Sequence, residues 1–463
     1  EIESPSQGLF LSNPLSESFL NKNESPVRKG SSASCDSTGS QKRKITLVNG
    51  TIMAGKLAVA TAAFSLPLAF QNLSFVLGIV LIVVYGAANW MTFNLLAYSS
   101  SKLNVYDYSL LMRHYLGRTL EQFYNFSMFF SSSIIIVAYT NVAYDIIGQL
   151  LYEVVFKYDG IFSSSHEFVE KGFMGDLSTR YYVISGLLII VYLPISLYKC
   201  VSKLSKVAVM ASIGTLYMVV IIVIQSFDYY TDFLKNQRTA SINGTHSNVS
   251  GEVNWTNWNV AFDSQLLFFV VSGNIILAFD CQFGLLSIYE HLEDRRVEKL
   301  YKLNNYGIIV ITVVLLLISI TGFLTSPVQG YELIFFRKAL GDSDWLMVVG
   351  KLSLIISTLT DVCLNNHWAR QSFFAMVFKQ SSISQKEGGV YSLISYIVLC
   401  FIAINYKSIV FYLSFAGGIC STTYCFIFPA MMYYQANGLG FKHWKNYSMI
   451  CVTLIISVIG FAG

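Results

Sequence analysis

The chain has 463 residues, of which 54% are hydrophobic and only 13% are charged. Soluble domains carry about 25% charged residues, so this composition excludes an ordinary soluble protein. The net charge of +4 says little about partners, because the basic residues are sorted by side of the membrane. We expect the lipid bilayer and a small molecule as partners, and no nucleic acid.

Residues 1–44 are rich in Ser, Asn and Gly and are expected to form a disordered cytoplasmic tail. The sequence then predicts eleven spanning helices, because each stretch offers ~20 mostly apolar residues. They lie near 46–70, 74–99, 119–156, 181–198, 205–227, 262–289, 304–325, 345–367, 390–405, 407–434 and 446–463. The predicted fold is an all-α integral membrane protein with one polytopic domain over 45–463.

Two of these spans carry polar or small residues where an ordinary spanning helix is apolar. The first contains Lys56 and the run Ala58–Ala63, and the sixth contains Asp280, Cys281 and Gln282. In a membrane such segments persist only where they line a cavity. A pair of them in corresponding halves indicates a transporter's binding site, so substrate translocation is the first hypothesis.

The basic residues predict the orientation of the chain. If the N-terminal tail is cytoplasmic, 21 of the 31 Lys and Arg fall on that side, as the positive-inside rule requires. The opposite side then holds the outer loop 228–261, which carries glycosylation sequons at Asn243, Asn248 and Asn254. The same pattern at Asn125 lies inside a span and is expected to arise by chance. The sequence fits a plasma membrane and a vacuolar or lysosomal membrane equally.

Four stretches with a common order and spacing carry a family resemblance. They are Lys56-x4-Thr61-x4-Leu66-Pro-Leu-Ala69-x2-Asn72, Leu193-Pro-Ile-Ser-Leu-Tyr-Lys199, Ile276-Leu-Ala-Phe-Asp-Cys281 and Phe415-Ala-Gly-Gly418 followed by Phe428-Pro429. Together they resemble the amino acid/auxin permease family of secondary transporters, over essentially 45–463.

The resemblance implies a LeuT-type fold, with a five-plus-five inverted repeat over 45–227 and 262–434, broken first and sixth helices, and an eleventh helix at 446–463. It also implies alternating access driven by a proton or sodium gradient. The chain departs from the family where Gly-x-Gly becomes Ala60-Thr61-Ala62 and where His-Pro becomes Gln282-Phe283. Ala unwinds a helix less readily than Gly, so the sequence leaves the break points open.

A zwitterionic substrate needs an anion site and a cation site. Free backbone N–H groups at the first break, from Ala60 to Phe64, would hold a carboxylate, and Asp280 would meet an ammonium group or carry a proton. The alternatives are close packing by small residues and a structural pair of Asp280 with Lys56. The residues expected at the substrate are Ala60, Thr61, Ala62, Ala63, Ser65, Tyr139, Phe279, Asp280 and Gln282.

The eighth span carries a polar face at helical spacing. Its hydroxyls would coordinate sodium together with broken-helix carbonyls, or form a hydrogen-bonded seam between helices. The residues expected to serve the coupling ion or proton are Lys56, Asp280, Ser357, Thr360 and Asp361. Lys56 would occupy a cation position in place of sodium, or extend to the cytoplasmic interface.

These features predict a monomeric secondary transporter of amino acids, proton-coupled rather than sodium-coupled, with no cofactor beyond the coupling ion. An amino-acid sensor that binds in the same pocket without turnover is the alternative. An enzyme is disfavoured, because the sequence shows no nucleophile–base set and no Walker loop. Six of the eight Cys fall in apolar runs and are expected to be buried without disulfides.

Overall fold

The computed structural model describes most of the helical core of the chain. The described residues are 46–48, 50–51, 54, 61–151, 185–186, 188–192, 194, 201–243, 253, 255–256, 265–294, 296–327, 332–337, 345–379, 383–406 and 408–437. All of them belong to one unit, Lys42–Gly463. The predicted tail 1–44, Lys56, Ala60, Asn248, Asn254 and the predicted eleventh helix lie outside the described residues.

Seven of the described helices are long and apolar enough to cross a membrane. Six are α4 (Phe75–Leu103), α6 (Arg118–Leu151), α8 (Val201–Asn243), α12 (Val297–Thr325), α13 (Trp345–Val377) and α14 (Gln385–Asn405). The seventh is the run Ile409–Asn437, which comprises α15 (Ile409–Phe415), two π-helical sections η6 (Ala416–Ser421) and η7 (Thr423–Ile427), and α16 (Phe428–Asn437). The all-helical fold class is confirmed in this part of the chain.

The remaining spans are short or interrupted, as expected for the first and sixth. In the first, a 3-10 segment η1 (Thr61–Ser65) precedes α3 (Leu66–Leu73). Pro67 stands within the first turn of α3, where its missing N–H is not needed. In the sixth, α10 (Gln265–Ala278) and α11 (Gln282–His291) are separated by three residues that are not helical. Of the fourth span, only parts of 185–194 are described.

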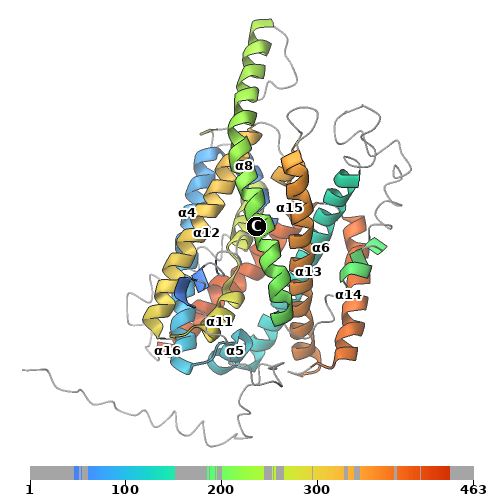
Figure 1. Cartoon of the computed structure of the whole chain (residues 1–463). Coiled ribbons are helices and arrows are strands. Elements are labelled where there is room, and N and C mark those ends of the chain that lie inside the picture. Colours follow the sequence, from blue (N-terminus) through green and yellow to red (C-terminus); the bar gives the residue numbers. More distant parts are fainter. Residues whose placement is uncertain are drawn as a thin grey trace, which may run out of the picture. The chain divides into compact units, whose positions relative to one another are not determined.

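The fifth helix is longer than the sequence predicted. α8 continues to Asn243, 16 residues beyond the expected end at 227, and Figure 1 shows it extending past the neighbouring helices. Charged residues such as Asp232 and Lys235 are incompatible with an apolar span but not with a helix in water. The first part of the predicted outer loop is therefore helical.

A short helix, α5 (Tyr108–Leu116), lies at the opposite end of the bundle from Asn243, together with α11 (Figure 1). The side chain of Asp107 caps it by accepting a 2.9 Å hydrogen bond from the Leu110 N–H. The segment 102–118 is amphipathic and basic, a pattern that predicts a loop lying along the membrane surface. Its apolar residues Tyr108, Leu111 and Met112 are instead buried, because α5 packs against α6 and α16.

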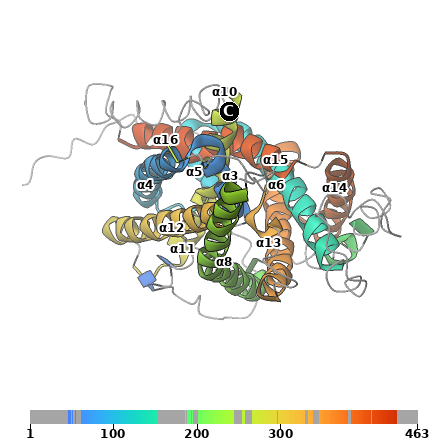
Figure 2. The same ribbon diagram turned by 90° about the horizontal axis from the view of Figure 1, so that it is seen from above.

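Helix packing brings the sixth and tenth helices into direct backbone contact. A Cβ built on Gly417 would collide with the carbonyl of Gly273, and one on Gly273 would collide with the carbonyl of Ser414. Small residues permit such close approach between membrane helices. Elsewhere α13 packs along both α6 and α8, and α12 along α4 (Figure 2). The glycine contact fixes how α10 faces η6.

An aromatic cluster joins the outer loop to two helices. The indole ring of Trp255 lies 5.3 Å from the ring of Phe75 and 5.5 Å from the ring of Phe323, centroid to centroid. The Val76 N–H also donates a 3.3 Å hydrogen bond to the Trp255 carbonyl. Trp255 therefore holds its part of the loop against the start of α4 and the end of α12.

Candidate functional site

The break in the sixth helix lies at Phe279, Asp280 and Cys281. The N–H groups of Phe279 and Asp280 donate to the carbonyls of Ile276 and Leu277, at 3.1 and 3.0 Å. These bonds span three residues rather than four, so the last turn of α10 tightens and the helix ends. α11 then begins two residues after Asp280, at Gln282. The break forms without any glycine in these three positions.

The carboxylate of Asp280 faces the tenth helix. Its Oδ2 accepts hydrogen bonds from the Ser421 hydroxyl, at 2.8 Å, and from the Tyr424 hydroxyl. Its Oδ1 accepts from the Cys425 thiol at 3.4 Å. In the part of the chain that the structure describes, the donors to this carboxylate are all neutral groups. Both oxygens are therefore engaged by η6 and η7.

Gln282 extends the network from α11 to the second helix. Its Nε2 donates to Asn89 Oδ1 on α4 at 2.9 Å, and its Oε1 accepts from the Cys425 thiol at 2.9 Å. The Cys281 N–H also donates to this Oε1, at 3.3 Å. Gln282 is fully buried, so it acts as a structural link between α4, the break and η7. The sequence had predicted a substrate contact for it.

The first and sixth helices are joined by one side-chain contact. Asn274 Nδ2 on α10 donates to the Ser65 hydroxyl on η1 at 2.7 Å, and that hydroxyl donates to the Ala62 carbonyl at 2.6 Å. Oδ1 of Asn274 is buried and has no hydrogen-bond partner among the described residues. A buried acceptor of this kind marks a place where a ligand or water donor fits.

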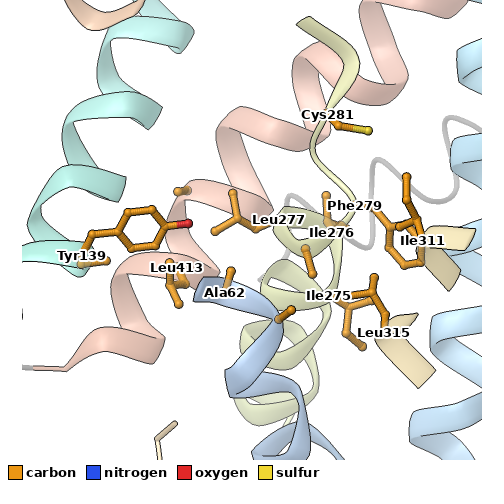
Figure 3. Packing of buried hydrophobic residues seen from close by; sticks show 14 of the residues in the cluster. Ala62, Tyr139, Ile275, Ile276, Leu277, Phe279, Cys281, Ile311, Leu315 and Leu413 are labelled. Carbon is orange, nitrogen blue, oxygen red and sulfur yellow. The ribbon is translucent and has the colours of Figure 1, made fainter. Parts of the chain in front are cut away.

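Tyr139 on α6 points toward the same segment. Its hydroxyl points toward Ala62, Leu277 and Leu413 (Figure 3), and it is close enough to the backbone of Ala62 for the two to interact electrostatically. Ala62 and Ala63 are buried, and Phe279 is fully buried on the other side of α10 near Ile311. The structure thus brings Tyr139, Ala62, Ala63 and Ser65 together. Of Thr61 only the backbone is described.

The polar face of the eighth span contacts the fifth helix. Ser357 Oγ on α13 is hydrogen-bonded to Thr215 Oγ1 on α8 at 3.0 Å. Thr360 donates to the carbonyl of Ile356 in its own helix, at 2.8 Å. Asp361 is close enough to Tyr139 for the two to interact electrostatically. Ser357 therefore forms the helix-to-helix seam that was the alternative to a sodium site.

Sequence reasoning missed the groups that surround Asp280. Ser421, Tyr424 and Cys425 were not among the residues that the sequence predicted at the site. Their spacing of three and four residues places them on one helix face, which is a signal that the sequence did contain. Asn274 was also missed. The five described Cys, at 281, 363, 400, 420 and 425, are buried and free of disulfides, as expected.

Comparisons with known proteins define the class. A structure titled "Crystal structure of MhsT in complex with L-phenylalanine" is similar with a TM-score of 0.57 and 11% identity, covering 91% of this chain and 100% of that one. A second structure is that of an Eremococcus coleocola manganese transporter in complex with an aromatic bis-isothiourea substituted compound. It has a TM-score of 0.47 and 13% identity, and the match covers 89% of this chain and 85% of that one. A search of curated proteins gave no match. At 11% identity the first likeness shows the fold, which is that of the LeuT-type membrane transporters.

The sequence itself gives the family. The family described as "Transmembrane amino acid transporter protein" matches residues 43–463. The chain therefore belongs to the transmembrane amino acid transporter family, as its four motifs predicted.

Proposed function

We propose that this protein is a secondary active transporter that moves amino acids across a membrane by alternating access, coupled to protons. The observation that carries the proposal is the junction between η1 and the α10–α11 break. There, the Asn274–Ser65 hydrogen bond joins the two interrupted helices, and Tyr139 reaches Ala62 from α6. Family membership and fold support transport as the function.

The substrate carboxylate would bind at the N–H groups of η1 and at the Tyr139 hydroxyl, because helix starts favour anions. The substrate ammonium would donate to Asn274 Oδ1 and to carbonyls at the end of α10. We assign Asp280 a different role, because its carboxylate faces the tenth helix and already accepts hydrogen bonds from Ser421, Tyr424 and Cys425. Leu277 and Leu413 beside Tyr139 favour an apolar substrate side chain (Figure 3).

Asp280 is then available for the coupling proton. It is an acid at membrane depth, where ionisable residues are costly and functional, and the described groups around it include no cation. Sodium coupling is the alternative. The position of Ser357 gives sodium coupling little support, because the Ser357 hydroxyl is hydrogen-bonded to Thr215. We further propose that the protein acts as a monomer with a cytoplasmic N-terminus, in a plasma membrane or a vacuolar or lysosomal membrane.

Uptake of a mixed labelled amino-acid pool into proteoliposomes, under an imposed proton or sodium gradient, tests the function. We expect accumulation driven by the proton gradient, lost in Asp280→Asn. The matched control is Asp294→Asn in the exposed loop after α11. There Arg296, 2.6 Å from the carboxylate, holds the pKa of Asp294 below its usual value.

Each other outcome has a defined meaning. Accumulation driven by sodium alone assigns coupling to sodium. Saturable binding with no uptake under either gradient would establish the sensor alternative. Tyr139→Phe is expected to weaken uptake at low substrate concentration, whereas Tyr412→Phe on the same bundle, outside the junction, is not.

A further inference from the structure

The hydroxyl group of Tyr424 has three neighbours to which it could donate its one hydrogen bond. It donates to Asp280 Oδ2, and it lies 3.0 Å from the Ser421 hydroxyl and 3.3 Å from the Ser131 hydroxyl on α6. A phenol carries one hydrogen. Only one of these three acceptors can receive it, so the choice depends on the state of the neighbours.

The protonation state of Asp280 decides that choice. An ionised carboxylate only accepts hydrogen bonds, and charge-assisted bonds to it are roughly twice as strong as neutral ones. When ionised, Asp280 therefore takes the Tyr424 proton and ties the break in the sixth helix to η7. When protonated, Asp280 itself becomes a donor. The Tyr424 hydroxyl is then released toward Ser131 on α6.

The backbone of Tyr424 is held independently of its side chain. Its carbonyl accepts a 2.6 Å hydrogen bond from the Tyr108 hydroxyl on α5, whose ring stacks on that of Tyr124 with centroids 4.5 Å apart. Tyr424 lies in a π-helical section, where the hydrogen-bond ladder shifts and such sections often mark functional sites. The residue thus contacts the sixth helix, α6 and α5 at once.

No charged side chain among the described residues interacts with the Asp280 carboxylate. The titratable groups that interact electrostatically with Asp280 are thiols and phenols on the elements that pack around it. They are Cys420, Tyr424 and Cys425 on the tenth helix, Cys281 at the start of α11, Tyr108 on α5, and Tyr124 and Tyr139 on α6. α4 contributes the neutral Asn89 through Gln282.

We propose that Tyr424 is a positioning residue that transmits the protonation state of Asp280 to the tenth helix, by donating its hydrogen bond to the sixth helix when Asp280 is charged and to α6 when it is neutral. This inference rests on the proton coupling proposed above. The proton itself is carried by the Asp280 carboxyl, and Tyr424 contributes no proton to the transported solute.

The test compares wild type, Tyr424→Phe and Tyr412→Phe in proteoliposomes, across a range of pH. Removing one donor to the carboxylate lets it keep its proton to higher pH. We expect the pH of half-maximal uptake in Tyr424→Phe to rise by about one unit, with substrate exchange at low pH preserved. Tyr412→Phe should match the wild type. In an Asp280→Asn background, which lacks proton-driven accumulation, Tyr424→Phe should leave the pH dependence of substrate exchange unchanged.

Infrared difference spectra give a second readout that simple misfolding would not produce. The carboxyl band that appears on acidification should be absent in Asp280→Asn and displaced in Tyr424→Phe. If Tyr424→Phe does not fold, Ser421→Ala tests the same contact and should shift the profile in the same direction by a smaller amount.

The outcomes separate this inference from the proposed function. A wild type with no proton-driven uptake removes the proton coupling and this inference with it. Proton-driven uptake with an unshifted profile and band in Tyr424→Phe overturns the inference alone, and so does a change that Tyr424→Phe causes in the pH dependence of substrate exchange in the Asp280→Asn background.

Discussion

Asn274 on α10 donates a 2.7 Å hydrogen bond to the hydroxyl of Ser65 on η1, and this bond links the two interrupted helices of the fold. Both side chains are buried. The bond therefore forms where neither partner can exchange it for bulk water, and it sets the spacing between the two halves of the proposed substrate site.

Asn274→Ala should lower the stability of the purified protein by about 1 kcal/mol, because it leaves the Ser65 hydroxyl without its donor. Ser65→Ala should have a similar effect, and the double variant should cost less than the sum. Thermal unfolding in detergent measures the cycle. Asn405→Ala, an exposed residue that bonds only its own helix at the Phe401 carbonyl, is the control. Full additivity would show that the two residues act separately.

The Asn274 variant should also weaken substrate binding more than Ser65→Ala does. The Asn274→Ala substitution removes the unpartnered Oδ1 that we propose accepts a hydrogen bond from the substrate ammonium. The Ser65→Ala substitution leaves this Oδ1 in place. Equilibrium binding of the transported amino acid to the purified variants gives the comparison. Equal affinities in the two variants would assign Asn274 a structural role only.

Ser357→Ala and Thr215→Ala should each destabilise the protein by about 1 kcal/mol, because they break the hydrogen bond between α13 and α8. Neither should change the response of uptake to sodium. Uptake with and without sodium, together with thermal unfolding of the single and double variants, checks both points. Loss of a sodium response in Ser357→Ala, with stability unchanged, would restore the ion-site interpretation of this face.

Gly417→Ala should destabilise the protein by roughly 1–3 kcal/mol or prevent its accumulation in the membrane. The added methyl group would collide with the Gly273 carbonyl, which is backbone and cannot rotate away. Gly186→Ala is the matched control, since a Cβ there meets no atom within 4 Å. Expression level and unfolding temperature measure the difference. A Gly417→Ala protein as stable as the control would mean that α10 and η6 separate easily.

Enzymatic removal of N-linked glycans should reduce the apparent mass of the protein produced in a eukaryotic host. The triple variant Asn243→Gln, Asn248→Gln and Asn254→Gln should show no such change. Asn125→Gln should leave the shift intact, because Asn125 is buried in α6 and its side chain donates to Ser109. A shift that persists in the triple variant would place the glycans at other sites, and no shift in the wild type would contradict the outer location of the loop.

Hydropathy predicted the seven long spanning helices that the structure describes, because twenty apolar residues have few other stable arrangements in a bilayer. It placed the end of the fifth helix at 227, since it reports where a helix leaves the membrane and not where the helix stops. The polar residues Asp280 and Gln282 correctly marked the sixth-helix break. The partner of Asp280 was beyond sequence reasoning, because it depends on how the tenth helix rotates about the Gly273–Gly417 contact.

Trp255 also bears on movement between the two repeats. Its ring packs on Phe75 of the first repeat and on Phe323 of the second, and it belongs to the segment of chain that connects them. The rings of Phe75 and Phe323 also pack on each other, with centroids 5.2 Å apart, so any rearrangement that separates them must break the contact of at least one of them with the indole. The segment that connects the two repeats therefore also holds them against each other. A molecule that bound this loop from outside would oppose any movement of the two repeats relative to each other.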